Sequence, residues 1–160
     1  MQELVIKKFP DPFLRKKASK VTKVTSCEID ILAEMAKVMY LSQGVGLAAT
    51  QVGINKQLVV IDVGNGLLKL INPVIVTRGA KEVFEEGCLS VPGISVKIKR
   101  SKTVTAHFLD EYGNAQKLHA DGLLARAIQH ELDHLAGMLI IDYINPVKKI
   151  LLRSVLKKRR

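Results

Sequence analysis

The sequence QHELDH at residues 129–134 places His130 and His134 four residues apart. On a helix, residues at this spacing share one face and lie about 6 Å apart along the axis, at a rise of ~1.5 Å per residue. The two imidazoles can then bind one metal ion. Glu131 stands beside that ion without having to bind it, so it can act as a general base. The motif predicts a metal site on a helix.

The residues around this motif predict a helix from about Gly122 to Ala136. Asp121 can cap its first turn, and Gly137 stands where a left-handed residue commonly ends a helix. The apolar positions of this segment are Leu123, Ala127, Ile128 and Leu135. The metal-binding spacing therefore falls on a helical segment.

The rest of the chain predicts two further helices and a sheet. Thr25 and Glu28 form a capping-box pair ahead of an apolar stripe, which predicts a helix over 26–42. Asn145 and Pro146 begin a closing helix. Apolar runs and alternation predict strands over 58–63, 67–71, near Val74, around 94–98, over the hairpin pair 103–109 and 115–119, and over 139–143.

The fold class expected is α+β, as one domain over residues 1–160. It has a mostly antiparallel sheet packed around a central metal-binding helix, with an N-terminal helix and a basic C-terminal helix over 147–160. A composition of 48% hydrophobic and 25% charged residues is ordinary for a globular protein with a sizeable core.

Composition and charge also indicate where the protein acts. No run approaches the ~18 to 20 uncharged apolar residues of a membrane helix, and residues 1–8 contain no apolar signal core. Two cysteines, Cys27 and Cys88, do not form a disulfide framework. We therefore expect a cytoplasmic protein that binds no membrane. Cys27 has the features of neither a ligand nor a nucleophile.

The net charge of +10 is concentrated at the C-terminus, where residues 147–160 contain seven basic residues and no acidic one. Val147, Ile150, Leu151 and Val155 fall near one face of the predicted helix. Two interpretations stand side by side. The helix can dock on its own domain with a solvated cationic face, or it can bind ribosomal RNA through its positive charge. No feature indicates DNA binding.

Two histidines are not a complete catalytic metal site, which usually has three protein ligands and an open position. A further histidine, a carboxylate or a cysteine can supply the third ligand. His107 and His119 lie in predicted strands and are more typical of surface or packed histidines. Cys88 is better placed, since residues 85–90 read as a polar, turn-like segment between apolar stretches. Its thiolate would complete a His2Cys site.

Three motifs in order carry a family resemblance. GVGLAATQ at 44–51, EGCLS at 86–90 and QHELDH at 129–134 have the order and separations of the three motifs of peptide deformylases. The chain resembles that family from its first strand to its closing helix. The EGCLS form and the helical C-terminus are similar to the bacterial type that serves translation.

The resemblance implies a hydrolase that removes the formyl group from N-formylmethionine on nascent peptides, with formate and a free N-terminal methionine as products. It implies that Cys88, His130 and His134 hold the metal and that Glu131 carries protons. Gln51 and the backbone N–H of Leu89 are then the donors to the formyl oxygen, where negative charge builds up.

The resemblance also implies a peptide-binding surface. Gly44 and Gly46 lack Cβ and let the substrate backbone approach closely. The apolar pocket for methionine is expected at Val45, Phe84, Leu123 and Ala127, next to Gly87. Arg126 faces the same region, where its aliphatic stem can cover the rim. An ion pair between Arg100 and Asp133 is expected to hold the metal-binding helix to the sheet.

Two lines of reasoning give different candidates for the metal. A His2Cys set with an open position is a familiar zinc arrangement. The resemblance implies Fe2+ in the cell, with Zn2+, Ni2+ or Co2+ able to occupy the same ligands.

Two other functions fit the sequence less well. A zincin metalloprotease takes its third ligand from a downstream histidine or glutamate, and no histidine follows His134. A catalytically silent ribosome-binding module is disfavoured because Gln51, Cys88, His130, Glu131 and His134 are all intact.

Overall fold

The computed structural model of the protein describes residues 3–157, with only the backbone at 153 and 155–157. Its helices are α1 (Ser26–Leu41), α2 (Gly122–Leu135) and α3 (Pro146–Lys157), with short 3-10 helices η1 (Pro12–Arg15), η2 (Ala49–Val52) and η3 (Ile140–Tyr143). Its strands are β1 (Gly46–Ala48), β2 (Leu58–Ile61), β3 (Leu68–Arg78), β4 (Lys81–Glu86), β5 (Val96–Ser101), β6 (Thr103–Leu109) and β7 (Ala115–Asp121).

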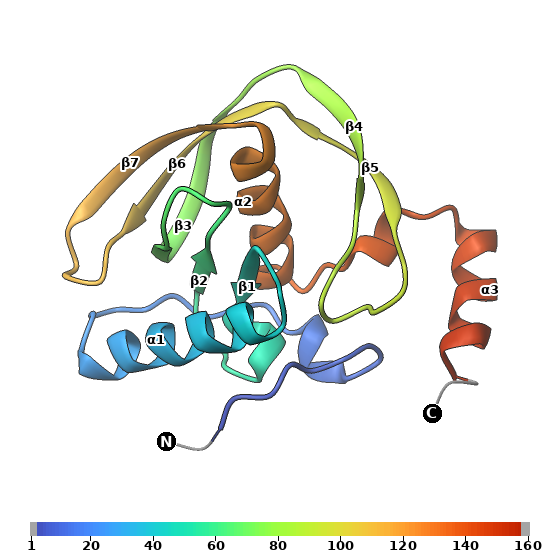
Figure 1. The fold of residues 1–160 in the computed structure, drawn as a ribbon, viewed down its shortest axis with the longest axis horizontal. Helices are drawn as coiled ribbons and strands as arrows, with labels where there is room; N and C mark the ends of the chain where they lie inside the picture. Colours follow the sequence, from blue (N-terminus) through green and yellow to red (C-terminus); the bar gives the residue numbers. More distant parts are fainter. Residues whose placement is uncertain (1–2, 158–160) are drawn as a thin grey trace.

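The strands form two antiparallel sheets, one of five strands in the order β1-β2-β3-β6-β7 and one of two strands, β4-β5. Figure 1 shows α2 between the two sheets, and α1 packs against the opposite face of the larger sheet. The described residues thus form one α+β domain with a metal-spacing helix at its centre, as predicted.

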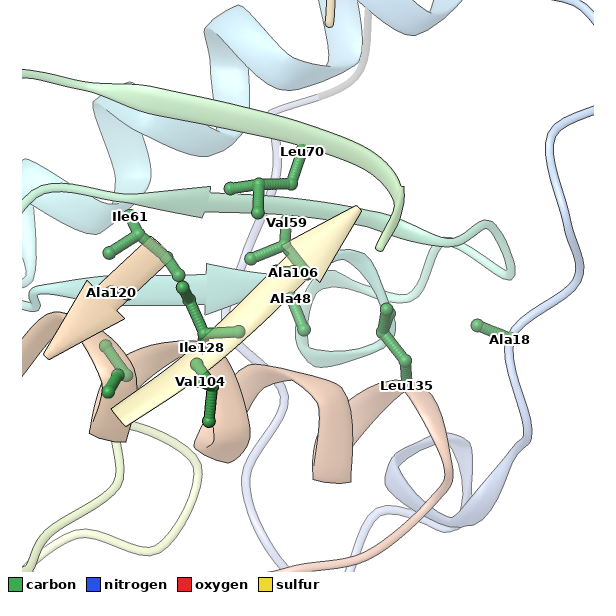
Figure 2. Packing of buried hydrophobic residues seen from close by; sticks show 12 residues of the cluster. Ala18, Ala48, Val59, Ile61, Leu70, Val104, Ala106, Ala120, Ile128 and Leu135 are labelled. Carbon is green, nitrogen blue, oxygen red and sulfur yellow. The ribbon is translucent and has the colours of Figure 1, made fainter. Parts of the chain in front are cut away.

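The sheet separates two apolar clusters, because successive residues of a strand point to opposite faces. On one face Val59 and Ile61 pack with Ile128 and Leu135 of α2 (Figure 2). On the other face Leu58 and Val60 pack with α1. A third cluster joins β5 to η3. The central helix is therefore fixed by burial of its apolar face, which leaves its histidine-bearing face toward β4 and the loop after it.

Several predicted boundaries need correction. The strands predicted over 67–71 and near Val74 are one strand, β3, which continues through a register shift between Ile71 and Val74. Asn72 makes this possible, since it adopts φ 53° and its side chain bonds the backbone N and O of Val21, both at 2.8 Å. Pro73 is tolerated at such a bulge.

The predicted strand over 139–143 is wrong, because Ile140–Tyr143 is the 3-10 helix η3. Three consecutive buried apolar residues cannot by themselves distinguish a strand from a buried helical turn. Here the Asp142 carboxylate accepts from the Leu139 N–H at 2.9 Å and pairs with Arg15 and Lys149, which stabilises the turn.

Strand β4 was not predicted, since four of the six residues of KEVFEE are charged and show no apolar alternation. It forms through pairing with β5, in which Val96 and Ile98 alternate with lysines as predicted.

The helix ends agree with prediction at the Thr25–Glu28 capping box and at Gly137, where φ is 78°. Asp121 occupies the N-cap position of α2 but makes no side-chain cap hydrogen bond.

The closing helix α3 begins at Pro146 as predicted, with the Asn145 side chain accepting from the Val147 N–H at 2.9 Å. In Figure 1 it stands at the margin of the molecule. Val147, Ile150 and Leu151 are 68, 68 and 63% exposed. Residues 158–160 of the predicted helix lie outside the described residues. Across residues 3–157, every helix is too short or too polar to span a bilayer.

Candidate metal centre

Cys88, His130 and His134 bring three potential metal donors together, all within 4.8 Å of one another. His134 Nε2 lies 3.2 Å from Cys88 Sγ and 3.2 Å from His130 Nε2. Bonds of about 2.0–2.3 Å in a tetrahedral arrangement separate neighbouring donors by roughly 3.3–3.6 Å. The donor set and its spacing therefore fit one tetrahedral metal ion.

The two histidines take their positions from α2, and the cysteine from the loop after β4. A hydrogen bond from the Val91 N–H to the Cys88 carbonyl, at 3.0 Å, closes that loop. His134 is 1% exposed, and its burial holds its pKa well below the ordinary value. A neutral imidazole is the form that binds metal.

Glu131 is buried beside the donors and keeps one carboxylate oxygen, Oε2, without a hydrogen-bonding partner among the described residues. Burial raises the pKa of Glu131 to about 7. A bound dication would oppose that shift, because it favours the ionised carboxylate. A buried, unpaired carboxylate oxygen next to three metal donors is suited to take up and release a proton.

Glu86 is the buried carboxylate that orients His130. Its Oε2 lies 3.1 Å from His130 Nδ1, which leaves Nε2 of that ring for a metal. Arg100 donates to both Glu86 oxygens, at 2.6 and 3.0 Å, and Arg126 donates to Oε1 at 3.0 Å. Burial alone would raise the pKa of Glu86, but His130 and Arg100 lower it to about 2.

The predicted ion pair between Arg100 and Asp133 is present, at 2.9 Å. The same guanidinium binds Glu86, so it links β5, the end of β4 and α2. Glu86 belongs to the EGCLS motif, but the sequence alone does not indicate that it orients His130. No local signal reveals it, because its three partners come from residues 14 to 44 positions away.

Two of the donors, Cys88 and His130, line a cavity of about 400 Å³. Of the predicted substrate-binding residues, its lining includes Gly44, Val45, Gly46, Gly87, Leu123 and Ala127, and of the predicted catalytic residues Gln51, Leu89 and Glu131. Phe84 lies beside the cavity rather than in its lining. Its half-exposed ring stacks on the guanidinium of Arg126, 4.3 Å from the ring centroid, while Arg126 itself is part of the lining.

Gln51 reaches the centre from η2 and is 1% exposed. Its Oε1 accepts from the Ala48 N–H at 2.8 Å, and its Nε2 lies 3.8 Å from Cys88 Sγ.

Three other residues lie away from the metal centre, as expected. His107 and His119 are exposed on the sheet, where His119 contacts Thr105, and Cys27 is exposed on α1.

Comparison with known proteins gives one consistent result. A family model described as polypeptide deformylase matches residues 4–150. A peptide deformylase of Caldanaerobacter subterraneus subsp. tengcongensis is 52% identical over 139 residues, which cover 87% of this chain and 87% of that protein. A peptide deformylase of Xylella fastidiosa is 47% identical over 166 aligned residues, covering 100% of this chain and 98% of that protein.

The solved structures agree. The crystal structure of peptide deformylase from Ehrlichia chaffeensis in complex with actinonin matches with a TM-score of 0.95 at 35% sequence identity. That match covers 100% of this chain and 99% of the other.

Proposed function

The chain belongs to the polypeptide deformylase family, and from this premise we propose how its own residues carry out the reaction. The protein is a metal-dependent hydrolase of the class acting on linear amides. It removes the formyl group from N-formylmethionine at the N-terminus of newly synthesised proteins and releases formate. The assignment of roles rests on one observation: Cys88, His130 and His134 converge, and Cys88 and His130 line the same cavity as Glu131.

Cys88, His130 and His134 would hold one divalent metal, with a thiolate and two neutral imidazoles as donors. When bound, the metal supplies Lewis-acid activation of water and of the formyl oxygen. Glu86 orients His130 through its hydrogen bond to Nδ1. Such a partner fixes both the ring orientation and the tautomer of a metal-binding histidine.

Glu131 is the proton carrier in this proposal. Its carboxylate takes a proton from the attacking water and returns it to the departing amine, which must be protonated to leave. The burial of Glu131 supports this role, because it keeps the proton on the path between water and amine. Its unpaired Oε2 is available for the transfer.

Gln51 and Leu89 are the proposed donors to the formyl oxygen. Negative charge develops on that oxygen when water attacks, and losing one fixed donor typically costs ~10² to 10³ in rate. The Gln51 amide lies within 3.8 Å of Cys88 Sγ, close to where the formyl group must sit. The backbone N–H of Leu89 directly follows the cysteine donor.

The peptide would lie along β1 and the residues just before it, where Gly46 and Gly44 permit close approach of its backbone. Val45, Leu123 and Ala127 provide apolar lining for the methionine side chain, and Gly87 leaves space beside Cys88. Phe84 contributes at the margin through its stack on Arg126. A cytoplasmic location is part of the proposal, because the substrates are nascent chains.

The test is formate release from a formyl-methionyl peptide, measured together with metal content. Wild-type protein is expected to release formate, and Glu131→Ala is expected to keep its metal and lose most of the activity. Cleavage of internal peptide bonds by metal-loaded protein, without formate release, would overturn the assignment.

We also infer Fe2+ as the metal in the cell. The family resemblance supports iron, whereas the donor set equally suits Zn2+, Ni2+ or Co2+. A thiolate beside iron is prone to oxidation, which would inactivate the protein in air. Protein purified anaerobically should contain iron and lose activity on exposure to air. Anaerobic protein that contains only zinc and is stable in air would contradict this inference.

We also propose that residues 147–160, the predicted basic helix, dock on the ribosome. Leu152 of this helix packs against the domain, whereas Val147, Ile150 and Leu151 are exposed, and this exposed apolar face supports a docking role. Attraction of basic residues to RNA weakens as salt rises. Deleting 147–160 should reduce co-sedimentation with ribosomes at low salt and leave turnover of a small formyl peptide intact. Equal co-sedimentation of both forms would count against docking.

A further inference from the structure

The side-chain amide of Gln51 is fixed at both of its polar atoms. The Ala48 N–H can only donate, so its 2.8 Å hydrogen bond identifies the atom facing it as Oε1. The Nε2 group must then point the other way, toward the metal centre. There it donates to Ser90 Oγ at 3.2 Å. The Gln51 backbone is held as well, since its carbonyl accepts from the Lys7 N–H at 2.7 Å.

Ser90 is 0% exposed and follows the cysteine donor by two residues. Its backbone carbonyl accepts from the Phe9 N–H at 2.8 Å, so the N-terminal segment holds the residue in place. The hydroxyl therefore presents a rigid acceptor to the Gln51 amide. Nothing in the roles assigned above uses this hydroxyl.

We propose that Ser90 is a positioning residue, whose hydroxyl directs the amide of Gln51 so that one of its two N–H groups stays available for the formyl oxygen. The proposal rests on the function given above for Gln51. The Nε2 group carries two hydrogens. Ser90 accepts one of them, and the planar amide then fixes the direction of the other.

Without the hydroxyl, the other acceptor that contacts the buried Nε2 is Cys88 Sγ, at 3.8 Å. A buried donor without a partner carries a desolvation cost, so the amide would turn toward the thiolate. That movement would misdirect the N–H needed at the formyl oxygen. The loss would appear in the chemical step, because the charge on that oxygen develops only there.

A double-mutant cycle tests the coupling. Ser90→Ala, Gln51→Met and the double variant are compared for kcat, KM and metal content, using formate release by metal-loaded protein. We expect Ser90→Ala to lower kcat about three- to tenfold, the range of one lost hydrogen bond, with KM within about twofold. In the Gln51→Met background, Ser90→Ala should change kcat by less than about twofold.

Thr105→Val is the matched control, because it also removes a buried hydroxyl hydrogen-bonded to a neighbour, here His119 at 3.2 Å. It should leave kcat unchanged. An equal loss of kcat from Ser90→Ala in both backgrounds would overturn the proposal, since it would mean that Ser90 does not act through Gln51. An unchanged kcat in the wild-type background would overturn it too.

Nuclear magnetic resonance gives a readout that does not depend on activity. The side-chain amide protons of Gln51, assigned by their loss in Gln51→Met, should show one slowly exchanging proton in wild-type protein. Ser90→Ala should abolish that protection, and persistent protection would overturn the proposal. Formate release by wild-type protein separates the outcomes, because its absence would refute the proposed function and not the role of Ser90.

Discussion

Gly46 lies directly against the side chain of Glu131. A Cβ added there would lie 2.4 Å from Oε1 of Glu131, closer than any real contact allows. Gly46→Ala should therefore displace the carboxylate and lower kcat by about 10², the effect of a displacement near 1 Å. Steady-state kinetics of formate release would measure this.

Gly44→Ala is the comparison for that change. Its added Cβ would meet Cδ1 of Leu89 at 2.6 Å, the far end of a flexible side chain that can move. We expect a smaller loss of kcat than for Gly46→Ala. Equal losses in the two variants would show that displacement of Glu131 is not the cause.

Glu28 links stability to pH. Hydrogen bonds from Lys56 and then Thr25 lower its pKa from 4.5 to about 2. Because the folded pKa lies below the unfolded one, the stabilisation is present above about pH 4.5 and is lost as the pH falls toward about 2. Urea unfolding across this interval should show a steeper loss of stability for wild-type protein than for Glu28→Gln.

Glu28→Gln is a suitable comparison because glutamine keeps an oxygen to accept in the capping box and removes the titrating charge together with the Lys56 hydrogen bond. The difference between the two pH profiles therefore isolates this carboxyl group from all others. Parallel profiles would contradict the role given to the Lys56 ion pair.

At the scale of single residues, the sequence predicts the metal donors better than it predicts the residues that hold these donors in position. His130 and His134 follow from helical spacing alone, and Cys88 from its motif. Glu86, Ser90 and the guanidinium of Arg126 act through partners on other elements, so no local pattern reveals these contacts. The predicted Arg100–Asp133 pair came from resemblance, not from a signal in the residues themselves.

At the scale of elements, α2 carries the centre and Arg100 holds it to β5. Arg100→Ala would leave buried Glu86 with Arg126 as its remaining arginine partner and partly buried Asp133 without its Arg100 partner, and breaking a buried ion pair typically costs about 3–5 kcal/mol. We expect a lower melting temperature and weaker metal retention, measured by thermal unfolding and metal analysis.

Lys99→Ala provides the control, since Lys99 is the exposed neighbour of Arg100 on the same strand. It should change neither quantity appreciably. An Arg100→Ala protein with wild-type melting temperature and metal content would remove the role proposed for this arginine.

The elements predicted from sequence are those with strong periodicity or end signals. The capping box identified α1, and the apolar face with Gly137 identified α2. The elements that the sequence did not predict correctly have physical causes. Asn72 allows β3 to continue through a bulge, charged β4 depends on its partner strand, and the side chain of Asp142 turns residues 140–143 into η3.

For the whole molecule, metal binding should add to the free energy of unfolding. The native state holds the three donors together, and the unfolded chain does not, so binding adds about 2.7 kcal/mol at a free concentration of one hundred times Kd. Adding a chelator should lower the melting temperature of wild-type protein. His134→Ala should show little response to chelator, and an equal response in both proteins would contradict the prediction.

The hairpin of β4 and β5 has a kinetic consequence. Glu86 at its end, Cys88 in the loop after it and Arg100 on its second strand belong to one short structural unit. When that unit separates from α2, the metal loses a donor and the support of another in the same event. The rate at which a chelator removes the metal should then level off with rising chelator concentration, at the opening rate of the hairpin. A rate of metal removal that keeps rising in proportion to the chelator concentration would mean that the donors release the metal one at a time.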